Sequence, residues 1–267
     1  MFSNFYFLYS ISQYMFGICN LGIVPIRSEA SDRSEMVSQL LFGDSFKIIE
    51  TSPKWTKILT AFDTYEGWID NKQFLEITED QYHLLENSES VLNGELIDFI
   101  SYETNQLMPI PLGSSLNFLD INEVNTVNFQ FEGKKECGIK PKDNLLKTAF
   151  LYLNAPYLWG GKTPFGIDCS GFTQMVYKLN GYTLLRDASQ QAKQGEALSF
   201  IEESEPGDLA FFDNDEGNII HVGIMMENNY IIHASGKVRI DRIDHLGIYN
   251  VDTGRHTHKL RVIKKII

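Results

Sequence analysis

The segment over residues 157–172 constrains this chain most, because it sets a cysteine between a glycine-rich loop and a helical pattern. It ends in Gly-Ile-Asp-Cys-Ser-Gly-Phe, with Cys169 as the cysteine. Apolar residues then recur at the spacing of one helix face, at Phe172, Met175, Val176 and Leu179. Asp168 and Ser170 are helix-start residues, and Gly181 is a stop signal. We therefore predict that Cys169 lies in the first turn of a helix.

A cysteine at a helix start is suited to nucleophilic chemistry. Unpaired N–H groups and the positive end of the helix dipole favour a thiolate there, so we expect a depressed pKa for Cys169. The thiolate is the nucleophile of cysteine hydrolases. A buried structural cysteine is the alternative. Gly160, Gly161 and Gly171 permit a close backbone approach, and the polar neighbours argue against an apolar pocket.

Two downstream histidines stand alone in apolar runs that predict consecutive strands. His221 lies in residues 219–225 and His233 in residues 230–235. An antiparallel pair would bring both imidazoles near the helix start, where a thiol needs a base and a group that orients it. A lone strand histidine is usually a core residue, but the order Cys, His, His favours a catalytic set. The remaining histidines lie outside any motif and are interpreted as surface or structural residues: His83, His245, His256 and His258.

Five motifs in order between Pro141 and Ile267 carry a family resemblance. They are Tyr-x-Trp-Gly-Gly, Asp-Cys-Ser-Gly-Phe, Pro-Gly-Asp-Leu-x-Phe-Phe, His-Val-Gly-Ile and Ile-His-Ala-Ser. This set resembles the NlpC-type, papain-like cysteine peptidases of bacterial cell-wall metabolism. The resemblance implies an α+β fold and a γ-D-glutamyl peptidase acting on peptidoglycan stem peptides. It places the nucleophile at Cys169, the base at His221 and the orienting residue at His233, with no metal or organic cofactor.

The resemblance also suggests roles for residues around the nucleophile. The Cys169 N–H and the Tyr157 hydroxyl would stabilise the oxyanion. Trp159 would form a wall of the cleft, although both aromatic residues could instead belong to the core. Asp168 is either a ligand for a substrate ammonium or a plain helix N-cap. Ser170 and Ser189 would hold the α-carboxylate of γ-D-Glu, with Ala188 inserted where a shorter Arg-Asp-Ser is common.

The part of the chain before Pro141 has β character. Residues 15–77 alternate short apolar runs with turn residues and resemble a bacterial SH3-like barrel that closes on Gly67-Trp68-Ile69. Residues 78–140 repeat this character more weakly, and we interpret them as a second, divergent SH3-like domain. The predicted fold is therefore an NlpC-type peptidase domain over residues 141–267, opening with a helix over residues 142–153, behind two all-β SH3-like barrels.

The same order of domains resembles a subgroup of the family in which the first barrel closes one end of the cleft. That resemblance implies release of L-Ala-γ-D-Glu from peptides with a free N-terminal L-Ala, in cell-wall recycling. Tyr65 would contact the ligand, together with Glu35 or Glu29. The alternatives are a wall-acting endopeptidase or amidase, and a non-catalytic wall-binding SH3-like protein. The diamino acid at the third stem position stays open.

Net charge and cysteine content restrict the possible binding partners and the cellular compartment. A net charge of −12 and a pI near 4.9 argue against nucleic acid or an anionic membrane surface as a partner. Three cysteines without a disulfide or zinc pattern fit a reduced compartment. Residues 1–14 are interpreted as an N-terminal extension that lacks signal-peptide features and is too broken for a membrane span. We expect a cytoplasmic monomer, or a periplasmic or secreted protein if that extension acts in export.

Overall fold

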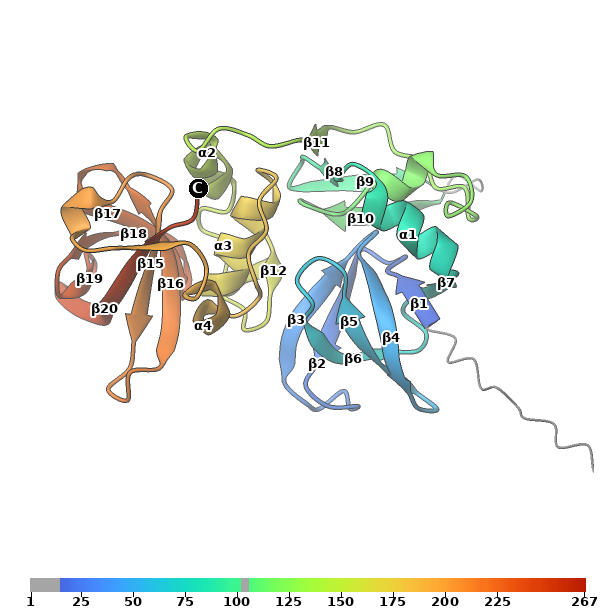
Figure 1. Ribbon diagram of the computed structural model, residues 1–267, viewed down its shortest axis with the longest axis horizontal. Helices are drawn as coiled ribbons and strands as arrows, with labels where there is room; N and C mark the ends of the chain where they lie inside the picture. The colour runs from blue at the N-terminus through green and yellow to red at the C-terminus, as the bar shows by residue number, and fades with distance from the viewer. Residues whose placement is uncertain (1–14, 102–105) are drawn as a thin grey trace, which may run out of the picture.

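The computed structural model describes residues 15–101 and 106–267, and the predicted extension over residues 1–14 lies outside them. Three units follow one another along the chain: a seven-stranded sheet, a small mixed unit and a larger C-terminal domain. In Figure 1 the blue sheet lies at the lower right, the green unit above it and the C-terminal domain mainly at the left. Within the described residues, no helix is long and apolar enough to cross a membrane.

The first sheet contains seven strands in the order β3-β2-β6-β5-β4-β1-β7. Their bounds are Met15–Ile18 (β1), Ile23–Arg27 (β2), Met36–Leu41 (β3), Ser45–Thr51 (β4), Trp55–Thr60 (β5), Glu66–Asp70 (β6) and Leu75–Ile77 (β7). Buried and partly exposed residues alternate along β5, as expected for a strand with one face on a core. The core is apolar and includes Val24, Ile26, Phe46, Ile58 and Ile69.

Residues 78–140 hold a helix that the sequence analysis did not predict. Helix α1 (Glu79–Asn87) starts after Thr78, whose side chain accepts a hydrogen bond from the Gln81 N–H. The Gln81 side chain accepts one from the Thr78 N–H in return. This capping box, followed by two acidic residues in the first turn, stabilises a helix start. The all-β interpretation of this segment therefore needs correction over α1.

The rest of this unit consists of two small antiparallel sheets, β9–β10 and β8–β11, and a 3₁₀ turn, η1. The bounds are Val91–Asn93 (β8), Ile97–Ser101 (β9), Leu107–Pro111 (β10), Asn117–Asp120 (η1) and Lys135–Cys137 (β11). Leu92 and Leu112 from this unit join Leu41 of the first sheet in the core of the C-terminal domain. One continuous apolar core therefore links all three units.

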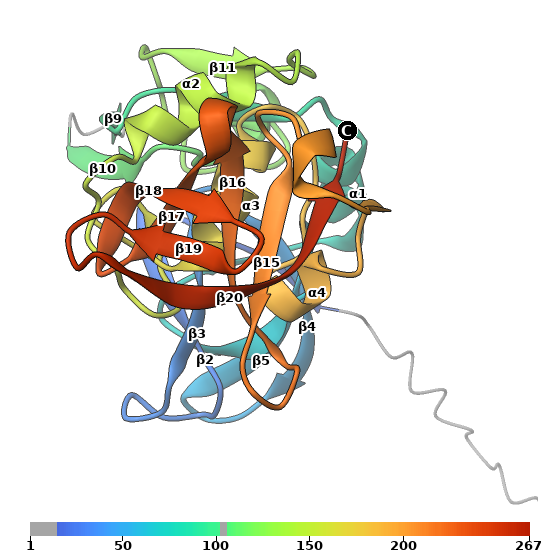
Figure 2. The ribbon, with the colours of Figure 1, turned by 90° about the vertical axis from the view of Figure 1, so that its left-hand side faces the viewer.

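The C-terminal domain packs helices against a second seven-stranded sheet, in the order β14-β20-β15-β16-β17-β18-β19. Because β19 also pairs with β20, six of these strands close into a ring, which Figure 2 shows from the side of β17 to β20. The strands are Glu196–Leu198 (β14), Leu209–Asp213 (β15), Ile219–Met226 (β16), Tyr230–Ser235 (β17), Lys237–Asp244 (β18), Gly247–Asn250 (β19) and Arg255–Lys265 (β20). The other elements are α2 (Asn144–Leu151), the hairpin β12 (Lys162–Thr163) and β13 (Gly166–Ile167), α3 (Cys169–Lys178), α4 (Ala188–Gln191), η2 (Ile201–Glu203) and η3 (Glu227–Asn229).

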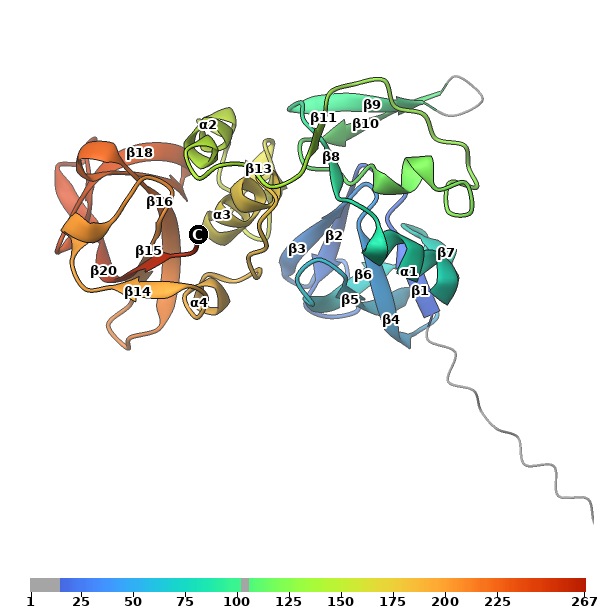
Figure 3. The ribbon, with the colours of Figure 1, turned by 45° about the horizontal axis from the view of Figure 1, so that its top comes forward.

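Helix α3 is buried along its whole length, although its sequence predicts one apolar face. It lies between the C-terminal sheet and the first sheet, as Figures 1 and 3 both show. Gln174 donates a hydrogen bond of 2.7 Å to Asp63, and Lys178 pairs with Asp44 at 3.0 Å. The first sheet thus covers the polar face of α3 with matched acceptors, as buried polar groups require. This packing fixes the first sheet beside the helix that carries Cys169.

Candidate active site

Cys169 is the first residue of α3, as the sequence predicts. Asp168 caps the helix, because its Oδ1 accepts a hydrogen bond of 2.6 Å from the Gly171 N–H. The Cys169 thiol is buried and accepts hydrogen bonds from the N–H groups of Val222 and Ser170. Since Val222 directly follows His221, the first of these bonds holds the thiol against the strand that carries the predicted base.

The expected depression of the Cys169 pKa is wrong. Burial raises the pKa of the thiol to about 12, and the negative charge of Asp168 acts in the same direction. The N–H groups at the sulfur and the charge of Arg186 oppose this shift more weakly. A thiol is the stable form in such surroundings, because a low-dielectric site disfavours the charged form. Burial therefore favours the neutral thiol, whose proton has to leave when the sulfur attacks.

His221 and His233 lie on the adjacent strands β16 and β17 and face each other. The Nε2 of His221 is 2.8 Å from the Nδ1 of His233, and the two rings stand at 85°. Gly223 is the direct cross-strand partner of His233. A Cβ at Gly223 would lie 2.8 Å from the His233 Cβ, which is too close for any side chain. The glycine of the His-Val-Gly motif therefore gives His233 the room to reach His221.

The surroundings of both imidazoles favour their neutral forms. Burial lowers the pKa of His221 well below its usual value, and the neighbouring His233 and His258 add to this effect. Burial also lowers the pKa of His233, against the opposing effect of Asp241. A neutral imidazole is the form that can accept a proton, so His221 is competent as a general base at neutral pH.

Two residues beside this pair were missed from the sequence. Asp241 on β18 is fully buried, and its Oδ2 lies 3.0 Å from the Nε2 of His233. His258 on β20 is half-buried and stacks on His221, with ring centroids 4.2 Å apart at 25°. The interpretation of His258 as a surface or structural residue did not place it against His221, where the structure has it. The remaining isolated histidines, His83, His245 and His256, are exposed.

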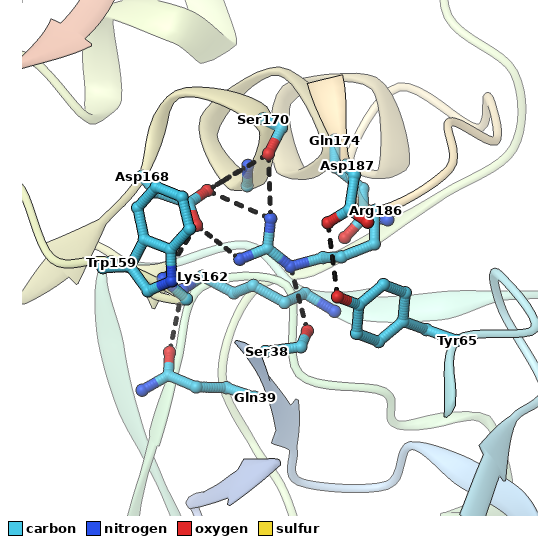
Figure 4. Close-up of polar contacts among 12 residues, drawn as sticks. Ser38, Gln39, Tyr65, Trp159, Lys162, Asp168, Ser170, Gln174, Arg186 and Asp187 are labelled. Carbon is cyan, nitrogen blue, oxygen red and sulfur yellow. Dashed lines mark hydrogen bonds and ion pairs between the residues drawn. The ribbon is translucent and has the colours of Figure 1, made fainter. Parts of the chain in front are cut away.

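The Asp168 carboxylate accepts hydrogen bonds from several protein donors. The Arg186 guanidinium contacts both carboxylate oxygens, at 2.6 and 3.0 Å, as Figure 4 shows. The Gly160 N–H adds a hydrogen bond of 2.8 Å. Arg186 is itself fully buried, and its Nη1 also donates to the Ser170 Oγ at 3.0 Å. The N-cap alternative for Asp168 is thus observed, and its negative charge is already balanced by Arg186.

A cleft of about 540 Å³ opens at Cys169 and is walled by both the first sheet and the C-terminal domain. We call it the Cys169 cleft. It is lined by Glu35, Val37, Tyr65, Trp159, Asp168, Cys169, Ser170, Asp187, Ala188, Ser189, Ile219 and Ile220. Seven predicted site residues therefore meet in one cavity, although Glu35 and Cys169 are 134 positions apart in the sequence. Glu29 does not line it, and His221 and His233 lie outside its lining.

Three hydrogen bonds join the first sheet to the peptidase side of this cleft. The Trp159 Nε1–H donates to the Glu35 Oε1 at 2.5 Å, and the Tyr65 hydroxyl donates to the Asp187 Oδ1 at 3.3 Å. The Arg186 Nε–H donates to the Ser38 Oγ at 3.0 Å. Asp187 is a lining residue that the sequence analysis did not single out. These contacts hold the first sheet at one end of the cleft.

Tyr157 is not among the residues that line the Cys169 cleft, but its phenol lies within electrostatic range of the thiol. Burial raises the pKa of the phenol to about 12, and negative charge at Cys169 or Asp168 acts in the same direction. The hydroxyl therefore keeps its proton at neutral pH. A protonated phenol can donate a hydrogen bond to an oxygen that becomes negative during the reaction.

A buried thiol at a helix start, packed against a strand bearing a neutral imidazole pair, defines a papain-like cysteine hydrolase. Comparison with known families agrees with this class. Residues 154–261 match the NlpC/P60 family, and residues 26–74 match the bacterial dipeptidyl-peptidase Sh3 domain. The chain therefore carries an NlpC/P60 domain behind an SH3 domain, and it is a cysteine peptidase.

Curated relatives match over most of the chain. A gamma-D-glutamyl-L-lysine dipeptidyl-peptidase from Bacillus subtilis is 29% identical over 74% of this chain and 71% of its own length. One from Bacillus cereus is 25% identical over 76% of this chain and 68% of its own. The crystal structure of an NlpC/P60 family protein from Bacillus cereus is 19% identical, covers 94% of this chain and 99% of its own, and has a TM-score of 0.77. This likeness confirms the predicted peptidase fold behind an SH3-like N-terminal β region.

Proposed function

We propose that this enzyme hydrolyses the γ-D-Glu–diamino acid bond of peptidoglycan stem peptides. It releases L-Ala-γ-D-Glu from peptides whose N-terminal L-Ala carries a free amine. One observation carries the proposal: Glu35 and Tyr65 of the SH3 domain line the same cleft as Cys169. The gamma-D-glutamyl-L-lysine dipeptidyl-peptidases similar to this chain support the choice of bond.

The residues that line the Cys169 cleft suit a short peptide with a charged N-terminus. Glu35 uses one carboxylate oxygen for Trp159 at 2.5 Å, and its other oxygen is available to a substrate ammonium. Asp187 lines the same cavity and offers a second carboxylate. Asp168 is a weaker candidate, because Arg186 already balances its charge. The SH3 domain leaves little room for any group attached to the N-terminal side of the first peptide residue.

The hydroxyls of Ser170 and Ser189 lie on the peptidase side of the cleft. We assign to them the α-carboxylate of γ-D-Glu, which needs hydrogen-bond donors. The Ser170 Oγ accepts a hydrogen bond of 3.0 Å from the buried Arg186, and its own proton points to the Asp168 Oδ1 at 3.4 Å, a long contact that a ligand carboxylate could replace.

The reaction follows from the protonation states. The Nδ1 of His221 takes the thiol proton as the Cys169 sulfur attacks the γ-carbonyl carbon, which forms a C–S bond. The Cys169 N–H and the Tyr157 hydroxyl donate to the oxyanion. His221 then gives its proton to the leaving amine of the diamino acid as the C–N bond breaks. In the second half His221 takes a proton from water as the water oxygen attacks the thioester carbonyl carbon and forms a C–O bond. The C–S bond then breaks, and His221 returns the proton to the departing sulfur, which restores the free thiol and the neutral base.

Mass spectrometry of the products from L-Ala-γ-D-Glu-L-Lys and its diaminopimelate counterpart tests the bond that is cut. We expect L-Ala-γ-D-Glu and the free diamino acid from at least one of the two. Cleavage between L-Ala and D-Glu, or no cleavage of either peptide, would contradict the proposal. Efficient cleavage of sugar-linked stem peptides would instead identify a wall-acting endopeptidase.

We further propose that the enzyme works as a monomer in the cytoplasm. The free thiols of Cys19, Cys137 and Cys169 fit a reducing compartment. Gel filtration and cell fractionation test these two points.

A further inference from the structure

Asp241 is fully buried and touches neither the thiol nor the Cys169 cleft. It meets the active site through His233, whose Nε2 lies 3.0 Å from the Asp241 Oδ2. His233 in turn contacts the Nε2 of His221 at 2.8 Å. We propose that Asp241 is a positioning residue that fixes which nitrogen of His221 carries a proton. This inference rests on the role of His221 as the base in the proposed function.

The assignment follows from the number of protons that each group can hold. An ionised carboxylate only accepts hydrogen bonds, so the Nε2 of His233 has to carry a hydrogen and donate it. A neutral His233 then has a bare Nδ1, which only accepts. The Nε2 of His221 has to donate to that nitrogen. A neutral His221 is consequently bare at Nδ1, which is the nitrogen left to take the thiol proton.

The surroundings of Asp241 keep it ionised and immobile. The Arg239 guanidinium donates to both carboxylate oxygens, at 2.7 and 2.9 Å, and the Val251 N–H donates to Oδ1 at 3.0 Å. Burial opposes the charge, but the hydrogen bonds from His233, Arg239 and Val251 hold the Asp241 pKa well below its usual value. Arg239 is itself anchored by Asp252 at 2.8 Å. Among the described residues, His233, Arg239 and Val251 all donate to this carboxylate.

An asparagine at this position cannot satisfy the same donors. If its amide nitrogen takes the place of Oδ1, it faces N–H groups from both Arg239 and Val251. If the amide nitrogen takes the place of Oδ2, it meets one Arg239 donor but can donate to the Nε2 of His233. The second arrangement has fewer donor–donor clashes. It reverses both histidine tautomers and leaves a hydrogen on the Nδ1 of His221, where a base is needed.

A matched control lies on the same strand. Asp244 is bonded to the exposed His256 at 2.9 Å, away from the catalytic histidines. Asp244→Asn makes the same chemical change at a similar contact. We expect Asp241→Asn to lower kcat by about 10²- to 10⁴-fold with little change in KM, as in other triads whose tautomer is reversed. Asp244→Asn should leave both parameters at the wild-type level.

Nuclear magnetic resonance of ¹⁵N-histidine-labelled free enzyme at neutral pH reads the tautomers without substrate. The wild-type enzyme and Asp244→Asn should show the His221 hydrogen on Nε2, and Asp241→Asn should show it on Nδ1. Wild-type kcat in a folded Asp241→Asn, or an unchanged His221 tautomer in it, would overturn the inference. If that variant does not fold, the wild-type spectrum decides, because a hydrogen on the His221 Nδ1 contradicts the assignment by itself. These readouts hold whichever peptide bond the enzyme cuts.

Discussion

The Nε2 of His221 lies 2.8 Å from the Nδ1 of His233, so only the Nδ1 of His221 remains for the thiol. This relationship depends on Gly223, whose missing side chain lets the two rings approach across the strand pair. Burial favours the neutral forms of both His221 and the Cys169 thiol, in place of the thiolate–imidazolium pair that the helix position of Cys169 suggests.

Removal of the nucleophile or the base should abolish hydrolysis. Cys169→Ala and His221→Ala each lose a group that forms or breaks bonds, so we expect no measurable turnover with the fold intact. His233→Ala should cost less, because an orienting residue leaves residual activity. Peptide hydrolysis by the purified variants checks this, with circular dichroism as the control. Near-normal turnover in Cys169→Ala or His221→Ala would refute the assignment.

Alkylation rates should reflect the raised pKa of the Cys169 thiol. Thiolates react with iodoacetamide, and a pKa of about 12 leaves very little thiolate on Cys169 at pH 7. Cys137 is exposed, so we expect it to be labelled first in the free enzyme. Mass spectrometry of timed samples measures both sites, and Cys137→Ser isolates the active-site reaction. Faster labelling of Cys169 would restore the thiolate interpretation.

Stability should decline as the pH falls from 6.5 towards 4. The folded protein holds His221, His233 and His258 with lowered pKa values, the last at about 4, chiefly through burial. Below pH 6.5 the unfolded chain binds protons that the folded chain does not, so unfolding becomes more favourable. His258→Phe keeps a stacked ring without a titrating group and should flatten the dependence of Tm on pH. An unchanged slope in this variant would contradict the role of His258.

Arg186 should be needed for stability as well as for the cleft. Arg186→Met leaves the Asp168 carboxylate buried without its partner, and such a change costs about 3–5 kcal/mol. Urea denaturation measures this loss. The double variant Asp168→Asn/Arg186→Met removes the stranded charge and should recover part of it. A loss below about 1 kcal/mol in the single variant would show that solvent compensates Asp168.

The sequence predicts local features better than long-range ones. The strands from Met15 to Asp70 follow from short apolar runs separated by turn residues, and the start of α3 follows from Asp168 and the residues around it. The buried polar face of α3 could not be foreseen, because its covering residues Asp44 and Asp63 come from the first sheet. Helix α1 was missed because the apolar residues among its nine positions show only a weak helical spacing. Its clearest sequence signal is the capping box at Thr78.

The residues of the candidate site also fall into those that local motifs reveal and those that only the folded structure brings in. Cys169, His221 and His233 stand in motifs, whereas Asp241 is one of several charged residues on an alternating strand. Only the register of β17 against β18, which sets Arg239 opposite His233, selects it. The thiol pKa also depends on packing, because burial outweighs the helix start that the sequence reveals.

The central claim is that the SH3 domain makes the cleft selective for a free N-terminal amine. The direct test compares kcat/KM for L-Ala-γ-D-Glu-L-Lys and its N-acetylated form at equal concentrations, with the diaminopimelate pair in parallel. Acetylation removes the charge that Glu35 meets and adds bulk where the first sheet stands, so we predict a loss of roughly thirty- to several-thousand-fold. Glu35→Gln should narrow this ratio. Comparable kcat/KM on the free and acetylated peptides would contradict the account, because the SH3 domain would then be a tether and the enzyme a wall endopeptidase.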